Sequence, residues 1–286
     1  MKLFTVDLYD YFGVAKPEGG VGTLTCYLQE NSVEISPNRL NPAMLVIPGG
    51  GYGMVSDREG EPVAIAFYNE GFSTFVLNYS VAPIRYPYQL VEGVMAMNYI
   101  RLNAKDLCVD ENMVCAVGFS AGGHLCSTLA TIPDCDDVVK IFNGKVKARP
   151  NAVILGYPVI TNTSKGHIGS FINLCGEENY DLQKRLDITN LVDENSSPAF
   201  IWSTYDDGVV PVKNSLMVAS AYEDAGVKFS LHIWGKGAHG LSVANKTVYG
   251  EGTGGYQILE NSTKSIAKWV EFAVEWLNEL GIGIKK

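Results

Sequence analysis

The sequence predicts an α/β protein with a mainly parallel central sheet, antiparallel strands at its N-terminal start, and helices on both faces. Short segments of strand-like composition alternate with segments of helical periodicity along the chain. Because parallel strands are joined by crossovers that usually contain a helix, this alternation indicates a parallel sheet covered on both faces. The predicted strands lie at residues 43–48, 72–79, 113–119, 151–158, 199–205 and 229–234.

Two of the helical segments carry a clear apolar stripe. In the first, Leu90, Val91, Val94, Met97 and Ile100 fall on one face. This spacing is typical of a helix that packs against a core. The second stripe, near the C-terminus, comprises Ile266, Trp269, Val270, Ala273, Trp276, Leu277 and Leu280. That helix either packs internally or forms the contact of a homo-oligomer, and the sequence leaves both arrangements open.

The first forty residues differ from the rest of the chain. Residues 3–9 and 21–29 have strand-like composition, with no helical pattern between them. They predict antiparallel strands added to one edge of the sheet. No linker rich in Pro, Gly or Ser divides the chain, so we expect a single domain over residues 1–286. The long interval between strands at residues 160–197 is expected to form a small lid or one wall of a pocket.

Composition and charge exclude several classes of protein. Of the 286 residues, 47% are hydrophobic and 19% are charged, which supplies a core and excludes a disordered chain. The formal net charge is −9, from 22 basic and 31 acidic residues. A nucleic-acid partner or an anionic membrane surface would need a basic face, so we expect neither.

The chain is expected to be cytoplasmic. Asp7 and Asp10 interrupt the N-terminal apolar residues before a signal-peptide core could form. The apolar runs elsewhere are too short for a membrane helix. The six cysteines show no CxxC spacing, which favours free thiols in a reducing compartment. No cluster has metal-ligand spacing, so we expect neither a metal nor a cofactor.

The strongest local signal is GFSAG at residues 118–122. This G-x-S-x-G pattern follows a predicted strand and precedes a predicted helix at residues 125–132. A sharp strand-to-helix turn in this context lifts the serine above the sheet, and the flanking glycines let the backbone pass closely. In isolation the pattern occurs by chance. In this context it favours Ser120 as a nucleophile over an ordinary turn serine.

A serine nucleophile needs a base, and the chain has four histidines. His239 lies in the glycine-rich segment directly after the last predicted strand, where an open parallel sheet builds its site. We therefore interpret His239 as the base. His124 is expected to pack or cap, His232 to be a strand side chain, and His167 is the weaker candidate.

The acid that orients the histidine should follow a strand between residues 120 and 239. Asp206 and Asp207 both follow the predicted strand at 199–205. Neighbouring side chains diverge, so only one of them can face the histidine, and spacing does not decide which. The other would cap the helix that starts near Val212 or would face solvent.

The glycines after the first parallel strand form a second signal, in PGGGYG at residues 48–53. No Lys-Ser or Lys-Thr follows, which excludes a Walker-type phosphate loop. Beside a nucleophile elbow, the N–H groups of Gly50 and Gly51 are expected to form an oxyanion hole with that of Ala121. The G-x-G-x-x-G pattern at residues 250–255 lacks the surrounding strand and helix, and we interpret it as a mobile loop near the base.

These motifs together resemble the α/β-hydrolases, and more narrowly the bacterial acetyl xylan esterase and feruloyl-esterase-like (BD-FAE type) group. The resemblance spans roughly residues 40 to 280. It depends on PGGGY at 48–52, DREGEP at 57–62, GFSAGGH at 118–124, DGVVP at 207–211 and HGLS at 239–242. The family pattern D-x-x-V-P favours Asp207 over Asp206. Pro48 stands where the related HGGG esterases have a histidine.

The resemblance implies a serine carboxylester hydrolase that deacetylates short acetylated xylo-oligosaccharides, with Ser120, His239 and Asp207 as the triad. Its partner would be a small-molecule ester. A general short-chain carboxylesterase or small-amide hydrolase would use the same triad. A catalytically inactive hydrolase fold that serves only for binding would lack one member of the triad. Tyr52, Tyr205, Trp202 and Trp234 lie near strand ends as candidates for stacking on a sugar, although such aromatic residues are more often core.

Overall fold

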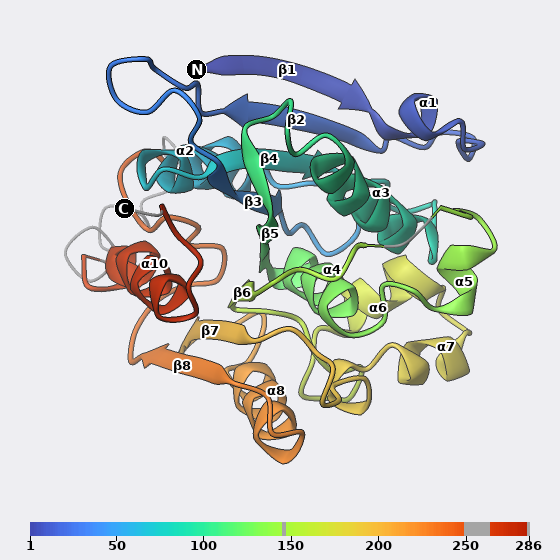
Figure 1. Ribbon diagram of the computed structural model, residues 1–286. Helices are drawn as coiled ribbons and strands as arrows, with labels where there is room; N and C mark the ends of the chain where they lie inside the picture. The colour runs from blue at the N-terminus through green and yellow to red at the C-terminus, as the bar shows by residue number, and fades with distance from the viewer. Residues whose placement is uncertain (145–146, 249–263, 285–286) are drawn as a thin grey trace.

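An eight-stranded sheet runs through the centre of the computed structural model, which describes residues 1–144, 147–248 and 264–284 (Figure 1). The spatial order of the strands is β1-β2-β4-β3-β5-β6-β7-β8. Their bounds are β1 Lys2–Asp7, β2 Thr23–Leu28, β3 Asn41–Ile47, β4 Ser73–Asn78, β5 Val109–Phe119, β6 Val153–Gly156, β7 Ala199–Thr204 and β8 Phe229–Trp234. The strands from β4 across to β8 are parallel, whereas β1 pairs with β2, and β2 with β4, in antiparallel fashion. The predicted mainly parallel sheet with an antiparallel start is confirmed.

One short helix was not anticipated between the first two strands. α1 (Leu8–Phe12) begins where the Asp7 carboxylate accepts the N–H groups of Tyr9 and Asp10, and it ends at Gly13 in the left-handed conformation. Five residues are too few to show helical periodicity. The cap residues at both ends were the only signal that could have revealed it.

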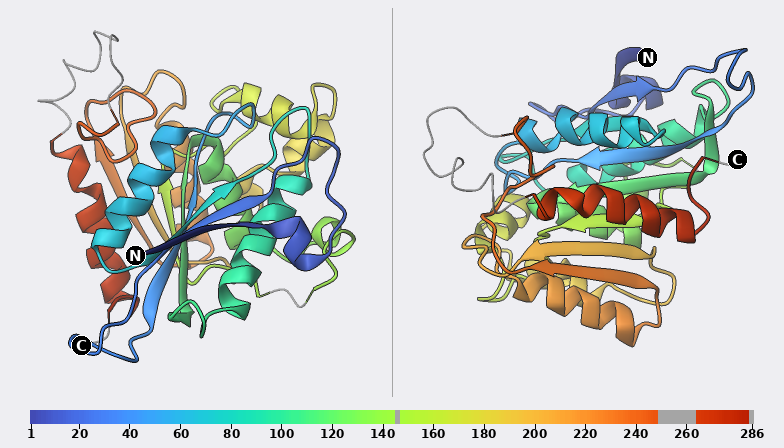
Figure 2. Two further views of the ribbon diagram at one scale, coloured as in Figure 1. Left: turned by 90° about the horizontal axis from the view of Figure 1, so that it is seen from above. Right: turned by 90° about the vertical axis from the view of Figure 1, so that its left-hand side faces the viewer.

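Helices cover both faces of the sheet (Figure 2). One face carries α1, α3 (Tyr88–Leu102), α4 (Ser120–Thr131) and α8 (Lys213–Asp224). The other carries α2 (Glu61–Asn69) and α10 (Trp269–Glu279). The central strand β3 is consequently buried at every residue, which explains why it reads as a continuous apolar run rather than an alternating one.

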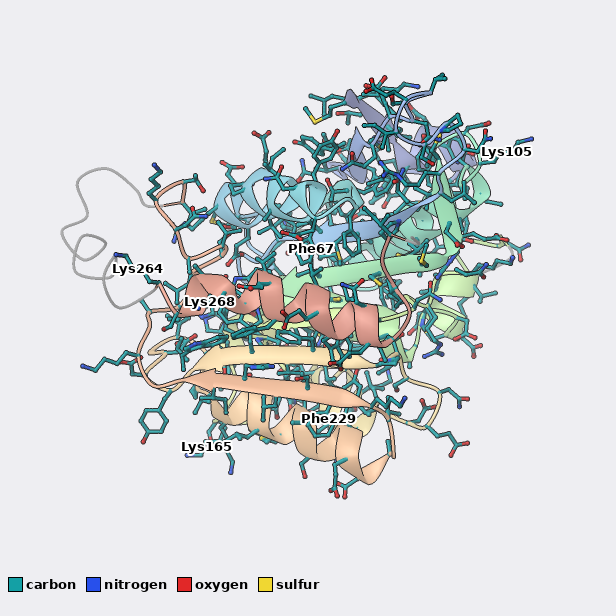
Figure 3. All side chains as sticks on the ribbon, turned by 60° about the vertical axis from the view of Figure 1, so that its left-hand side comes forward. Phe67, Lys105, Lys165, Phe229, Lys264 and Lys268 are labelled. Carbon is teal, nitrogen blue, oxygen red and sulfur yellow. The ribbon has the colours of Figure 1, made fainter. Side chains whose placement is uncertain are left out.

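The C-terminal helix α10 packs against the sheet, which is one of the two arrangements that the sequence allows. The Trp269 side chain is fully buried and stacks on Trp202 of β7, with ring centroids 5.1 Å apart. It also contacts Phe67 of α2, which faces the same layer (Figure 3). The Trp276 ring is tilted against the Phe200 ring, with centroids 6.0 Å apart, and Trp276 is only partly buried.

The remaining helices are short. Residues 160–197 contain α6 (Ile168–Cys175), α7 (Tyr180–Arg185) and η2 (Ile188–Asn190). Elsewhere in the described part of the chain lie α5 (Asp136–Val139) and the single turns η1 (Asp57–Glu59) and η3 (Ile266–Lys268). Within the described ranges, no helix has both the length and the apolar character that crossing a membrane requires.

Glycine permits α4 to approach the sheet at backbone distance. A Cβ at Gly122 would lie 2.2 Å from the carbonyl oxygen of Ile47 and 2.3 Å from that of Pro48. A Cβ at Gly118 would lie 2.3 Å from the carbonyl oxygen of Gly122. The two glycines of the G-x-S-x-G pattern therefore allow close packing of β3, β5 and α4.

Replacing Gly122 with alanine should force β3 and α4 apart, because the new methyl group would meet backbone atoms that cannot rotate away. Gly122→Ala should lower the free energy of unfolding by about 1–3 kcal/mol or more, as for overpacked cores. Urea titration measures this change. Gly235→Ala is the matched control, because a Cβ there meets nothing within 4 Å. Its effect should stay within about 1 kcal/mol, and equal effects of the two substitutions would contradict the packing argument.

Candidate active site

Ser120 occupies the turn between β5 and α4, as the sequence predicts. Its φ is +52°, in the left-handed region that residues other than glycine rarely adopt. This conformation costs free energy, which the close packing of Gly118 and Gly122 offsets. The residue is 7% exposed and lines a pocket above the carboxyl ends of the strands.

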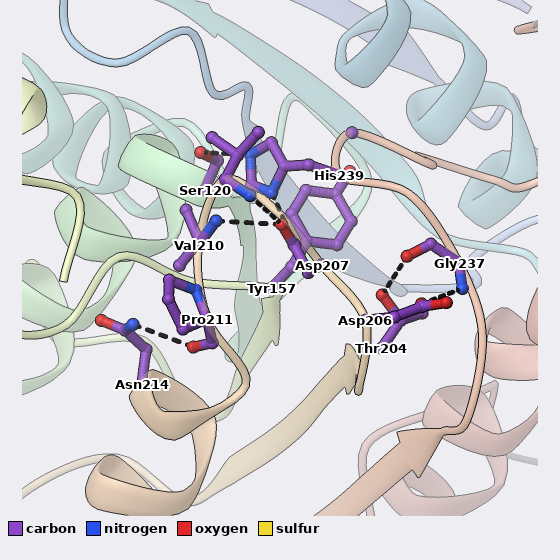
Figure 4. A network of polar contacts seen from close by, with 12 residues as sticks. Ser120, Tyr157, Thr204, Asp206, Asp207, Val210, Pro211, Asn214, Gly237 and His239 are labelled. Carbon is purple, nitrogen blue, oxygen red and sulfur yellow. Dashed lines mark hydrogen bonds and ion pairs between the residues drawn. The ribbon is translucent and has the colours of Figure 1, made fainter. Parts of the chain in front are cut away.

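Three predicted residues meet at this point (Figure 4). The Ser120 Oγ lies 2.9 Å from His239 Nε2, and His239 Nδ1 lies 2.7 Å from Asp207 Oδ2. A carboxylate only accepts hydrogen bonds, so Nδ1 carries the proton and Nε2 is left to accept from the serine hydroxyl. The three side chains follow β5, β7 and β8, whose carboxyl ends share one edge of the sheet.

Of the two adjacent aspartates, Asp207 faces the histidine. Its other oxygen, Oδ1, accepts the N–H groups of Val209 and Val210, both at 2.9 Å. Asp206 points away and is exposed, and its Oδ1 accepts the Gly237 N–H at 2.6 Å. It does not cap α8, which has no side-chain cap. Instead it anchors the loop that carries His239.

The glycine loop, residues 49–53, lies beside Ser120. Gly50 and Gly51 have φ values of +124° and +65°, which only glycine adopts without strain. Among the described residues, their N–H groups have no acceptor, although the Gly50 carbonyl accepts from Gly53 and Met54. Ala121 is fully buried in the first turn of α4, where backbone N–H groups lack partners within the helix. The loop is therefore suited to hold an anion.

The pocket has a volume of about 460 Å³ and a lining of mixed polarity. Its lining comprises Gly50, Gly51, Met54, Ser56, Arg58, Glu59, Ser120, His167, Gly169, Asn173, Val209, His239 and Gly240. Three of these residues, His167, Gly169 and Asn173, come from the 160–197 segment. Asn173 Nδ2 donates to the Gly51 carbonyl at 2.9 Å and so connects this segment to the glycine loop.

Comparison with known proteins gives the family. The BD-FAE family model matches residues 34–222. The chain belongs to the BD-FAE family. It is 36% identical over 86% of its length to endo-1,4-beta-xylanase B of Butyrivibrio fibrisolvens, and 32% identical over 84% to an acetylxylan esterase of Xylanibacter ruminicola. The matched regions are 39% and 46% of those two proteins, so the chain spans less than half of each.

Solved structures agree with this family assignment. The acetyl ester-xyloside bifunctional hydrolase of Caldicellulosiruptor lactoaceticus is 32% identical, with a TM-score of 0.80 over 98% of this chain and 97% of that one. The carboxylesterase Cest-2923 of Lactobacillus plantarum is 28% identical, with a TM-score of 0.82 over 100% and 99% of the two chains. These neighbours put this BD-FAE member among the α/β-hydrolase esterases.

The predicted aromatic stacking surface is not observed in this BD-FAE chain. Trp202 is fully buried against Trp269, and Tyr52 is 1% exposed. Tyr205 is 70% exposed, but neither it nor Trp234 lines the pocket. Trp202 is enclosed because every residue of β7 is buried between core layers that include α8 on one face and α10 on the other.

The other histidines have separate environments. His124 is buried, with Nδ1 2.8 Å from the Tyr52 hydroxyl and Nε2 2.8 Å from the Leu186 carbonyl. His232 lies in β8 and stacks on Phe200 of β7, as expected of a strand side chain. His167 Nδ1 lies 2.8 Å from Ser170 Oγ, and burial, aided by the nearby His239, lowers the pKa of this histidine. Residues 250–255 lie outside the described residues.

Several pocket residues had no role in the sequence prediction. Arg58 and Glu59 belong to DREGEP at 57–62, which contributed to the resemblance without a role for any residue. Asn173 lies in the 160–197 segment, where no motif marks it. The pairing of Asn173 with the glycine loop spans 122 positions of sequence, so local pattern could not reveal it.

His124 should make stability depend on pH. Burial lowers its pKa from 6.5 to about 4, so the folded chain takes up this proton less readily than the unfolded chain. Its contribution is complete above pH 6.5 and is lost as the pH falls towards 4. Replacement by glutamine should therefore reduce the stability loss between pH 7 and pH 4.5 by about 2–3 kcal/mol. Urea unfolding at both pH values tests this, and an unchanged loss in His124→Gln would refute it.

Proposed function

We propose that this BD-FAE member is a serine carboxylester hydrolase that removes acetyl groups from short acetylated xylo-oligosaccharides. The observation that carries the proposal is the continuous hydrogen-bonded series from Asp207 through His239 to Ser120 at the floor of an open pocket. The esterase relatives and the fold support the same reaction class.

In the proposed acylation step, Ser120 Oγ attacks the ester carbonyl while His239 Nε2 accepts the hydroxyl proton. The imidazolium that forms is stabilised by Asp207, whose position is fixed by the N–H groups of Val209 and Val210. The carbonyl oxygen gains negative charge and is held by the N–H groups of Gly50, Gly51 and Ala121. As the carbon–oxygen bond breaks, His239 gives its proton to the leaving alcohol.

Deacylation repeats these steps with water as the nucleophile. His239 Nε2 accepts a proton from the water, whose oxygen attacks the acyl carbon, and the same N–H groups hold the second oxyanion. Collapse of the intermediate releases acetate and returns the proton to Ser120 Oγ. Removing a single oxyanion donor commonly lowers kcat by about 10²–10³, which indicates how much of the rate depends on these backbone groups.

The sugar part of the proposal is supported by the names of the relatives and by the polar side chains at the pocket. Arg58, His167 and Asn173 reach the lining and could hydrogen-bond to sugar hydroxyl groups. The relatives include an acetylxylan esterase and an acetyl ester-xyloside hydrolase.

One observation favours a second candidate, a general short-chain carboxylesterase. Among the described residues, the pocket lining contains no tryptophan, tyrosine or phenylalanine, and Met54 and Val209 make part of it apolar. A carbohydrate site commonly uses an aromatic ring as a platform, and that platform is missing among the described lining residues. The carboxylesterase from Lactobacillus plantarum has the same fold.

Acetate release from acetylated xylo-oligosaccharides, compared with hydrolysis of p-nitrophenyl acetate, tests the substrate. We expect a higher kcat/KM for the sugar ester, because the pocket would then bind the carbohydrate in the transition state. Ser120→Ala should reduce both activities by about 10⁴-fold or more, since the nucleophile is lost.

Turnover of the activated ester alone would refute the sugar substrate and favour the carboxylesterase. Labelling with a fluorophosphonate distinguishes the two esterase hypotheses from a binding protein without catalytic activity. Wild type should be labelled at Ser120 and Ser120→Ala should not. A folded wild type that resists labelling and cleaves neither ester would refute the hydrolase proposal.

A further inference from the structure

Glu59 is a buried carboxylate at the pocket to which the proposed reaction gives no role. Glu59 is the last residue of η1 and is 3% exposed. Oε2 accepts the Gly49 N–H at 2.8 Å, and Oε1 accepts the Tyr157 hydroxyl at 2.6 Å. Both oxygens are therefore bound within the molecule, and one of them holds the glycine loop.

Tyr157 extends this connection to the loop that carries His239. Its hydroxyl oxygen accepts the Ser242 N–H at 2.9 Å, and its ring lies edge-on to the His239 ring with centroids 4.9 Å apart. A single series of hydrogen bonds thus runs from Gly49 through Glu59 and Tyr157 to Ser242. It crosses beneath the site and connects segments more than 190 residues apart in sequence.

Ser242 is held in place from three directions. Its N–H donates to Tyr157, its hydroxyl donates to the Arg58 carbonyl at 2.6 Å, and its carbonyl accepts from Trp269 Nε1 at 2.9 Å. These three hydrogen bonds hold a backbone whose φ is +52°. Arg58 Nη1 also donates to the Gly240 carbonyl at 3.2 Å. Arg58 therefore contacts the histidine loop, residues 235–242, on both sides of Leu241, whereas Glu59 reaches this loop through Tyr157.

The space between Glu59 and Ser120 leaves little freedom. A Cβ at Gly49 would lie 2.7 Å from Glu59 Oε2 and 3.0 Å from Ser120 Cβ. Gly49 is thus packed directly between the carboxylate and the nucleophile. A shift of the Glu59 carboxylate would move the loop that follows Gly49.

Glu59 is held by hydrogen bonds within the molecule, because burial removes its carboxyl group from solvent. Burial raises the pKa of Glu59, while the hydrogen bonds from Tyr157 and Gly49 and the charges of His239 and Arg58 oppose that increase. Buried polar groups of this kind are stable only when every partner is present. Here both oxygens have a partner.

We propose that Glu59 is a positioning residue that acts through Tyr157 to fix the spacing between the glycine loop and the loop carrying His239. The inference depends on the proposed function, because it assigns the oxyanion donors to the first loop and the base to the second. Glu59 and Tyr157 hold the groups that meet in the transition state. Their loss lowers kcat, while KM, which depends on the remaining pocket, changes little.

Glu59→Gln, Tyr157→Phe and the double variant test this role. Gly49 and Tyr157 donate to different oxygens of Glu59, and in glutamine an NH2 group that only donates replaces one of these oxygens, so one of the two hydrogen bonds is lost. We expect kcat for p-nitrophenyl acetate, per active site titrated with a fluorophosphonate, to fall about 10-fold to 100-fold in Glu59→Gln. KM should stay within about twofold. The double variant should be no worse than the worse single variant, because both substitutions break the same series of hydrogen bonds.

Glu61→Gln is the matched control. Glu61 lies two residues away and its Oε2 accepts the Tyr27 hydroxyl at 3.0 Å, but it does not line the pocket. It should retain wild-type kcat. A similar fall in Glu61→Gln, or additive losses in the double variant, would overturn the proposal.

Dividing kcat by the number of active sites titrated with the fluorophosphonate distinguishes a loss of positioning from a loss of folded protein. If Glu59→Gln keeps the wild-type kcat per titrated site while Ser120→Ala is inactive, the proposal is overturned. This holds even if Glu59→Gln is less stable than the wild type. If Glu59→Gln does not fold, Tyr157→Phe decides, and wild-type kcat per site in that variant would overturn the proposal. A wild type that is neither labelled nor active would instead refute the proposed function.

Discussion

The close contact between α4 and the ends of β3 and β5 is the constraint on which the site depends. Gly122 lets the helix backbone approach the Ile47 and Pro48 carbonyls, and Gly118 lets the strand pass beneath the helix. With the helix this close, the chain must turn sharply at Ser120, which accounts for its positive φ. The glycine loop follows β3 directly, so the same contact sets its distance from Ser120.

Buried carboxylates hold the other parts of the site together. Asp207 uses one oxygen for His239 and the other for two backbone N–H groups, so it has little freedom to rotate. Glu59 divides its oxygens between the glycine loop and Tyr157 in a similar way. Each carboxylate joins loops from different strands, and a buried acceptor that loses a partner is costly. This cost favours a single arrangement of the loops.

Sequence pattern predicted the sheet and the meeting of Ser120 with His239 because both follow from local signals. Parallel strands appear as apolar runs, and the elbow appears as glycines around a serine between a strand and a helix. The choice between Asp206 and Asp207 depended on a family pattern, since both follow the same strand. Trp202 and Tyr52 were expected near the pocket, but both are buried. Trp202 packs against Trp269 of α10 and the Tyr52 hydroxyl contacts His124 of α4, and neither contact can be predicted from local sequence. The role of Glu59 depends on partners far away in sequence, which no local pattern reveals.

The contact of Trp269 with Ser242 has a consequence for the order in which the site matures during synthesis. Ser120 and the glycine loop are synthesised before α10, because both precede it in the chain. The Ser242 carbonyl obtains its indole partner only after α10 has emerged and docked. Ser120 is therefore synthesised before the support of the proposed base, because Trp269 follows it by 149 positions. A nascent chain that ends between these two residues would carry Ser120 without the contact that secures the loop of His239.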